Sequence, residues 1–270
     1  MKTKKRLAVA LTSLIAFTAF AAIAYGEVFE TGNLTLEVDG GVKPNKLPKK
    51  KMAPIKLDAE GQVTTKNGET PPIADKVVVE FDKNGKYFNK GFPTCNPRKL
   101  VDRRTAAAKK ACKKALIGKG STRAIVDFPD QAPFDAIGPL LIFNGPNKGK
   151  TKQVIFHVFA NVPAPTAFVV AAKLKPLKGG KFGTRMITKV PTISGGSGTL
   201  VEFDARVGKK YKVKKKKKNG KKKVKKYSIL KARCKNKRFV AQFEVTWRGG
   251  DKLQGGIARS CKQKKGRKRR

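Results

Sequence analysis

The side chains of this chain that could carry acid–base chemistry form two groups of carboxylates. Asp127, Asp130 and Asp135 surround two Phe/Pro dipeptides, while Glu202 and Asp204 share one face of an expected strand. Glycoside hydrolases use a pair of carboxylates across a sugar-binding cleft. The chain has only one Trp and four Tyr with which to hold a sugar, and few of them are near these acids. A carboxylate hydrolase is therefore the alternative function, and we expect no catalytic residue and no enzyme.

The single histidine, His157, lies in an expected strand with Ile155 and Phe159 on the same face. No serine or cysteine motif accompanies it, so we expect a packed residue rather than a catalytic base. The segment 82–85 resembles a calcium loop but lacks the second acid and the distal glutamate, which favours a turn. The glycine-rich segment 195–198 leads into a strand and has no phosphate-binding lysine. We expect neither a metal nor a cofactor.

Four cysteines, Cys95, Cys112, Cys234 and Cys261, are spaced too widely for a zinc clip, and His157 is far from all of them. An even number of cysteines in an exported chain predicts disulfides, with three possible connectivities. The favoured one is local. Cys95–Cys112 would bracket an expected helix, and Cys234–Cys261 the last pair of expected strands.

Residues 1–26 have the pattern of a secretory signal. A basic start precedes an apolar run over 7–23 and a small-residue cleavage pattern at 22–24. We expect a protein that is secreted or associated with the cell envelope, with no membrane span in the mature chain. An uncleaved membrane anchor would begin in the same way and is the alternative.

The elements that must position these residues are mainly strands, expected at 33–38, 54–60, 76–82, 152–162, 166–175, 199–213 and 238–248. In the last of these, Phe239, Ala241, Phe243, Val245 and Trp247 fall on one face. Asn-Gly pairs at 67–68, 84–85 and 219–220 predict three two-residue hairpins. The fold class is therefore mainly β, an antiparallel β-sandwich or open barrel, forming a single domain over 27–261.

One α-helix is expected at about 97–116, stapled by Cys95–Cys112. Asn96 can cap it, Pro97 suits its first position, and Gly118 ends the pattern. Its basic face is interpreted as a solvated surface. That face carries Arg103, Arg104, Lys109, Lys110, Lys113 and Lys114.

The charge of the chain is extreme and uneven. The formal net charge is +45, from 49 Lys and 14 Arg against 18 acids, and falls to +41 without the four basic signal residues. From residue 205 to 270 there are 29 basic residues and only two acids, Glu244 and Asp251. Lysine is a hydrated point charge that attracts any polyanion, whereas arginine recognises phosphate with defined geometry. The tail 262–270 is expected to be disordered.

A lysine-rich hairpin at about 209–228 is the candidate binding element. Its candidate polyanion contacts are Lys214, Lys215, Lys216, Lys217, Lys218, Lys221, Lys222 and Lys223. A two-residue turn would place Lys218 opposite Lys221, with Lys217 and Lys216 opposite the next two lysines. Facing like charges destabilise a strand pair, so we expect a mobile tip that a polyanion orders. The alternative is a solvated loop that only aids solubility.

Several segments resemble a group of uncharacterised secreted proteins of soil actinobacteria. They are Gly91-Phe-Pro-Thr-Cys95, Thr105-Ala-Ala-Ala-Lys-Lys-Ala-Cys112, Phe128-Pro-Asp-Gln-Ala-Pro133, Leu140-Leu-Ile-Phe-Asn-Gly145 and Gly195-Gly-Ser-Gly-Thr199. The resemblance implies export and a shared fold, and it transfers no functional residue.

Together these features predict an exported, non-catalytic β protein that associates by charge with anionic polymers. Wall phosphopolymers, acidic glycans and extracellular DNA are the candidate partners, without specific nucleic-acid readout. A hydrolase or a purely structural envelope component are the alternatives.

Overall fold

The computed structural model describes residues 26–216 and 222–264, so the expected signal lies outside the described residues except for Gly26. Strands dominate these described residues, which also contain one α-helix and three short 3₁₀ helices. The strands are β1 (Glu27–Thr31), β2 (Leu34–Lys43), β3 (Lys46–Leu47), β4 (Ala53–Pro54), β5 (Lys56–Thr65), β6 (Ala74–Asp82), β7 (Gly85–Tyr87), β8 (Leu116–Val126), β9 (Phe134–Asn144), β10 (Lys152–Ala160), β11 (Thr166–Pro176), β12 (Phe182–Lys189), β13 (Gly198–Val207), β14 (Lys210–Lys216), β15 (Lys222–Ser228), β16 (Leu230–Ala232), β17 (Arg238–Trp247), β18 (Lys252–Ser260) and β19 (Lys262–Gln263). The helical elements are η1 (Pro97–Lys99), α1 (Thr105–Ala111), η2 (Lys113–Ala115) and η3 (Ser194–Gly196).

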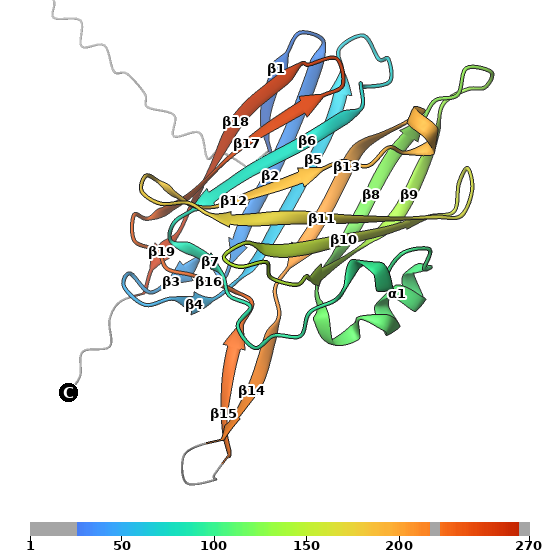
Figure 1. The fold of residues 1–270 in the computed structure, drawn as a ribbon. Coiled ribbons are helices and arrows are strands. Elements are labelled where there is room, and N and C mark those ends of the chain that lie inside the picture. The colour runs from blue at the N-terminus through green and yellow to red at the C-terminus, as the bar shows by residue number, and fades with distance from the viewer. Residues whose placement is uncertain (1–25, 217–221, 265–270) are drawn as a thin grey trace, which may run out of the picture.

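Twelve strands form one antiparallel sheet in the order β1-β2-β5-β13-β8-β9-β10-β11-β12-β6-β17-β18. The sheet curves until its two edge strands, β1 and β18, lie beside each other (Figure 1). The result is a nearly closed, barrel-like sheet. This confirms the expectation of a mainly antiparallel β fold carrying one disulfide-stapled helical element.

A charged and aromatic seam joins the two edge strands. Arg259 of β18 contacts the carboxylates of Glu27 at 2.7 Å and Asp39 at 2.6 Å, and its hydrogen bonds lower the pKa of Asp39. Two residues after Glu27 in β1, the ring of Phe29 meets that of Phe243 edge to face at 5.0 Å. A Cβ at Gly255 would come within 2.6 Å of both rings, so the seam requires glycine there.

The inner face of the sheet is apolar because alternate residues of each strand point inward. In β17 the expected face is confirmed at its end, where Val245 is 7% and Trp247 2% exposed. Trp247 packs with Leu34, Leu36 and other residues of the opposite strands. The period-two pattern of the sequence therefore identifies the core side of this strand correctly.

The continuous helix expected at 97–116 is wrong. The segment instead forms three short pieces, η1, α1 and η2. The break follows Leu100, and Asp102 adopts a positive φ of 54° that a right-handed helix does not allow. Asn96 does cap, since its side chain accepts from the Arg98 backbone N–H at 3.0 Å, but it caps only η1.

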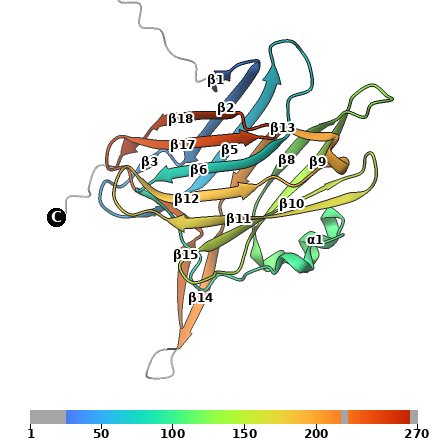
Figure 2. The same cartoon turned by 45° about the horizontal axis from the view of Figure 1, so that its top comes forward.

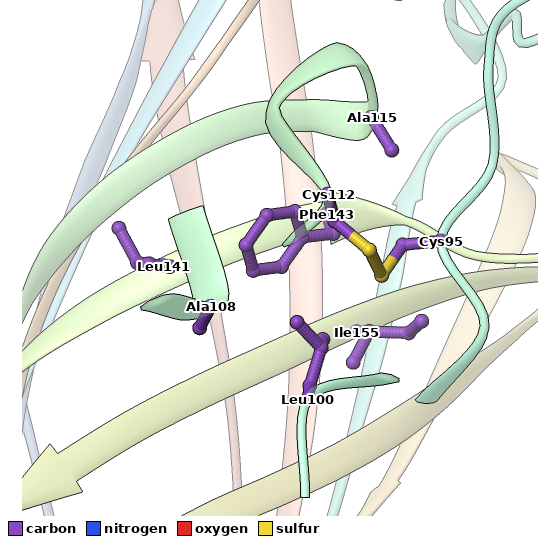
Figure 3. Packing of buried hydrophobic residues seen from close by; sticks show 8 residues of the cluster. All are labelled: Cys95, Leu100, Ala108, Cys112, Ala115, Leu141, Phe143 and Ile155. Atoms are coloured by element: carbon purple, nitrogen blue, oxygen red, sulfur yellow. A yellow bond between two sulfur atoms is a disulfide. The ribbon is translucent and has the colours of Figure 1, made fainter. Parts of the chain in front are cut away.

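We call residues 95–115 the clamp, because they fold over the outer face of β9 and β10. The disulfide Cys95–Cys112 closes the segment, and Leu100 and Ala108 lie fully buried beneath it. These side chains pack with Phe143, as Figure 3 shows. The clamp is therefore fixed to the sheet by a covalent crosslink and an apolar contact.

Both local disulfides are present, as the spacing favoured. Cys234–Cys261 lies at the open ends of the β17–β18 pair and packs with Leu47, Ile55 and Phe239. The basic tail, expected to be disordered over 262–270, starts in ordered structure: β19 pairs in parallel with β3. Residues 265–270 lie outside the described residues. Over the described ranges, no helix has the length and hydrophobicity needed to cross a membrane.

Two of the three expected Asn-Gly hairpins are wrong. After Asn67-Gly68 the chain crosses the barrel, because β5 pairs with β2 and β13 whereas β6 pairs with β12 and β17. After Asn84-Gly85, β7 pairs with the distant β16. Asn84 is 1% exposed there and donates to the Asp82 carboxylate instead of exposing a turn. Only the third pair stands between paired strands, β14 and β15.

We predict that the Cys95→Ala/Cys112→Ala double variant loses about 3 kcal/mol of unfolding free energy, because the crosslink no longer restricts the unfolded chain. Urea unfolding followed by the fluorescence of Trp247, the only tryptophan, measures the change. Hydrogen exchange at 96–111 should rise in the same variant. An unchanged unfolding midpoint and unchanged exchange would contradict the clamp's dependence on the disulfide.

Candidate functional site

Two stretches of the sequence are almost free of acids. Between Asp82 and Asp127 there are 13 basic residues and a single acid, Asp102; between Asp204 and Glu244 there are 19 basic residues and no acid. The structure brings these distant stretches together, because β7 of the first pairs with β16 of the second. More than half of the 63 basic residues thus belong to two neighbouring parts of the fold.

The β14–β15 hairpin projects from the barrel at this junction (Figure 1). Its register differs from expectation by one residue: Lys216 pairs with Lys222 and Lys215 with Lys223. The expected two-residue turn at 219–220 lies outside the described residues, together with three of the candidate lysines, Lys217, Lys218 and Lys221. Like charges still oppose each other along the hairpin. Mobility of its tip stays a prediction.

The base of the hairpin is an aromatic stack, which fixes this register. Tyr211 and Tyr227 are cross-strand partners whose rings stack at 5.6 Å. Phe88 stacks on Tyr227 at 5.4 Å, and Phe92 meets Tyr211 edge to face at 4.5 Å. Beside them Ile229 is fully buried. We call these five residues the hairpin root.

Two further contacts hold the root to the chain before the clamp. The Tyr211 hydroxyl donates to the Lys90 carbonyl at 2.9 Å. Gly91, at φ 71°, lets the backbone pass Val213, whose methyl carbon would lie 3.3 Å from a Cβ. Because the backbone demands positive φ and the space is small, glycine is required here.

The five residues of the root are uncharged, and a lysine packs against two of their rings. The Lys231 ammonium lies 4.1 Å from the centre of the Phe88 ring and 5.1 Å from that of Tyr227, a cation–π arrangement. Burial, and then the neighbouring Tyr227, raise the pKa of Tyr211, so its phenol stays neutral at physiological pH. The hairpin therefore stands on an apolar base whose nearest charge is a cation.

A buried amide network supports the segment that carries the root. Asn144 is fully buried and accepts from the Tyr87 hydroxyl at 2.7 Å and from Asn89 at 3.0 Å. Its own amide N–H donates to the Pro93 carbonyl. Lys152 donates to the Tyr87 carbonyl at 2.6 Å, and burial, followed by Lys86, lowers its pKa. Sequence reasoning missed this network, because no spacing rule connects residues some 55 positions apart.

His157 lies beneath the clamp, fully buried. Its Nε2 is 2.8 Å from the carbonyl oxygen of Arg103 and donates to it. Burial lowers the pKa of His157, so the ring is neutral in the folded protein. The expectation of a packed residue is confirmed.

The two groups of carboxylates meet at one arginine. Arg123 of β8 binds Asp135 at 3.1 Å and Glu202 at 3.0 Å, and these bonds, that to Glu202 most strongly, raise the pKa of Arg123. Asp127 instead accepts from Thr70, and Asp204 lies 3.5 Å from Arg206. Within the described ranges, no group of three or more His, Cys, Asp or Glu could hold a metal ion.

The ion pairs of the described residues lie in the barrel and not in the clamp or the hairpin. Among the described residues, none of the ion pairs involves the clamp or the hairpin. The ion pairs lie instead at the seam, around Arg123, and between neighbouring strands such as β6 and β12. The carboxylates in these ion pairs thus neutralise basic residues of the barrel and none of the described residues of the clamp or the hairpin.

The fold and the site together define a nearly closed antiparallel β protein with a projecting lysine hairpin. Comparison with protein-family models, curated proteins and solved structures found no match to this chain. A functional assignment therefore depends on the charge and geometry of the site itself.

We predict that Ile229→Ala costs about 3 kcal/mol of unfolding free energy, because a fully buried side chain is removed from the hairpin root. Ile137→Ala is the matched control, since Ile137 is 64% exposed and its truncation should change stability by less than about 0.5 kcal/mol. Equal unfolding midpoints for the two variants in urea would contradict the role of the root.

We predict that stability falls as the pH drops below about 6.5, because the unfolded chain then binds a proton that buried His157 does not. His157→Gln keeps a donor for the Arg103 carbonyl but cannot titrate. Its unfolding free energy should therefore depend less on pH between about 7 and 5.5 than that of the wild type. Identical pH profiles of the two proteins would show that the protonation of His157 is not coupled to folding.

Proposed function

We propose that this is an exported, non-catalytic protein that binds anionic polymers of the cell envelope by charge, through its lysine hairpin. One observation carries the proposal. The hairpin projects from the barrel on a fixed root, in a stretch of 19 basic residues that contains no acid. Such a surface attracts polyanions from all directions.

The choice of lysine supports a binding mode that reads charge rather than sequence. Every candidate contact on the hairpin is Lys, which offers a point charge and no bidentate fork. Repeating phosphates on a wall polymer fit this surface because they present charge at short, regular intervals. Acidic glycans and extracellular DNA also present repeated negative charges. Measuring the binding of the protein to each of these polymers identifies the ligand.

The state of the candidate catalytic groups supports a non-catalytic role. Arg123 occupies the space between the carboxylates of Asp135 and Glu202, where a hydrolase would hold its sugar. His157 is buried under the clamp and has no serine or cysteine motif beside it. These groups are explained by structure without a reaction.

Two disulfides support export, since such bonds form and persist in oxidising compartments. The basic and apolar pattern of residues 1–26 points the same way. The envelope is the first surface with dense negative charge that an exported cation meets.

We predict that the mature protein binds isolated cell wall at about 0.15 M salt, and double-stranded DNA with a steep salt dependence. Changing Lys216, Lys217, Lys222 and Lys223 to Gln should weaken both. On DNA the log–log salt slope should fall by up to about 3.6, because each phosphate that is no longer neutralised lowers it by about 0.9.

The matched control changes four exposed lysines elsewhere on the barrel to Gln, so that net charge falls equally. These are Lys175, Lys178, Lys189 and Lys252. Abolition of all binding by about 0.15 M salt would contradict the proposal and favour a purely structural protein. Equal weakening in the hairpin and control variants would show that binding follows net charge and not this site.

A further inference from the structure

We propose that the clamp is a second arm of the same site, and that one polyanion chain lies across both the clamp and the described strands of the hairpin, where Lys225 and Lys226 are exposed. The side chains assigned to the clamp arm are Lys109, Lys110, Lys113 and Lys114. This inference rests on the proposed function, because it concerns how the same ligand is held.

The clamp is a dense basic surface in its own right. Its basic side chains are all exposed: Arg98, Lys99, Arg103, Arg104, Lys109, Lys110, Lys113 and Lys114. One acid, Asp102, is the only carboxylate in the segment. A solvated helix face would be the simple explanation, but the segment is three short turns crosslinked and packed on the sheet. The charges are therefore held in place.

Clamp and hairpin share one apolar base. Phe92 precedes the clamp and Ile117 follows it, and both pack in one buried cluster with Ile229 and Tyr211 of the hairpin side. The backbone N–H of Gly208, just before β14, donates to the carbonyl of Ile117 at 2.9 Å. The two ends of the clamp and the two strands of the hairpin thus start from the same buried apolar cluster.

The gap between the two arms is short for a polymer chain. Phe92, which touches Tyr211, is three residues from Cys95, so the chain between them spans at most about 11 Å. Cys112, next to Lys113, has its Cα only 5.6 Å from that of Cys95. Phe92 and Cys112 are therefore at most about 17 Å apart. This is about twice the screening length of about 8 Å at physiological salt, so the two arms are largely screened from each other, but one polymer chain can reach both. Figures 1 and 2 both show the hairpin and α1 beside the same region of the barrel.

Gathering several like charges on one arm is unfavourable for the free protein, because neighbouring charges repel. The disulfide, the Leu100 and Ala108 contacts and the bond from His157 to Arg103 oppose this repulsion on the clamp side. A bound polyanion would remove it. An arm fixed in advance also loses little entropy on binding, which raises affinity.

The ligand that fits is a linear polymer with closely spaced negative charges, long enough to reach both arms. Engagement of the second arm is then intramolecular and raises the affinity well above that of either arm alone. A chain that covers only one arm gains nothing from the other. Chain length is therefore the property that separates a two-armed site from two independent ones.

The test uses oligodeoxythymidylate as the probe, in a short form of a few nucleotides and a long form of several tens, with binding followed by fluorescence anisotropy. The clamp variant changes Lys109, Lys110, Lys113 and Lys114 to Gln, and the control is the four-lysine barrel variant described above. All eight side chains are exposed, so both variants should keep the wild-type unfolding midpoint.

For the long probe we expect the clamp variant to bind roughly tenfold more weakly than the control, with a salt slope lower by up to about 2.8, at about 0.7 per phosphate of a single strand. For the short probe we expect a change of no more than about twofold, since the hairpin still binds it. Equal behaviour of clamp and control variants, or equal weakening on both probes, would overturn the inference. If the hairpin variant also matches the control, the proposed function itself fails.

Discussion

The packing of Tyr211 and Ile229 against Phe92 and Ile117 is the contact on which the functional surface depends. It joins parts of the chain more than a hundred residues apart, and both basic elements start from it. Without this apolar base, the hairpin would be a strand pair weakened by opposed lysines, and the clamp a separate loop. A two-stranded hairpin has little stability of its own in water, so its direction is set by its root.

The distribution of carboxylates is the second constraint. With 18 acids for 63 basic residues, the chain can neutralise only part of its charge. Several acids bind arginines of the barrel: Glu27 and Asp39 close the seam with Arg259, and Asp135 and Glu202 bind Arg123. Most of the net positive charge lies in the stretches 83–126 and 205–243, which meet where β7 pairs with β16, and this separation of charge gives the molecule a strongly basic region.

Local sequence patterns predict much of the fold, but they do not predict how the site is assembled. Alternation along residues 239–247 predicts their inward face, because period two is a property of any half-buried strand. The disulfides follow from sequence-local spacing. The Asn-Gly turn at 84–85 misleads, because a buried hydrogen bond from Asn84 to Asp82 replaces the solvated turn. The root could not be predicted, since nothing in the sequence shows that Phe88 meets Tyr227. The observed hairpin register differs by one residue from the one predicted for a two-residue turn, and the Tyr211–Tyr227 stack lies at its base.

Lysine footprinting shows most directly whether one polyanion covers both the clamp and the hairpin. The mature protein would be acetylated briefly with and without a long oligodeoxythymidylate, and the modification of each lysine measured by mass spectrometry. A site with two arms on one root predicts strong protection at Lys109, Lys110, Lys113 and Lys114 together with Lys225 and Lys226, and little at Lys175, Lys178, Lys189 and Lys252. Protection spread evenly over all exposed lysines, or confined to the hairpin alone, would contradict a site built from two arms on one root.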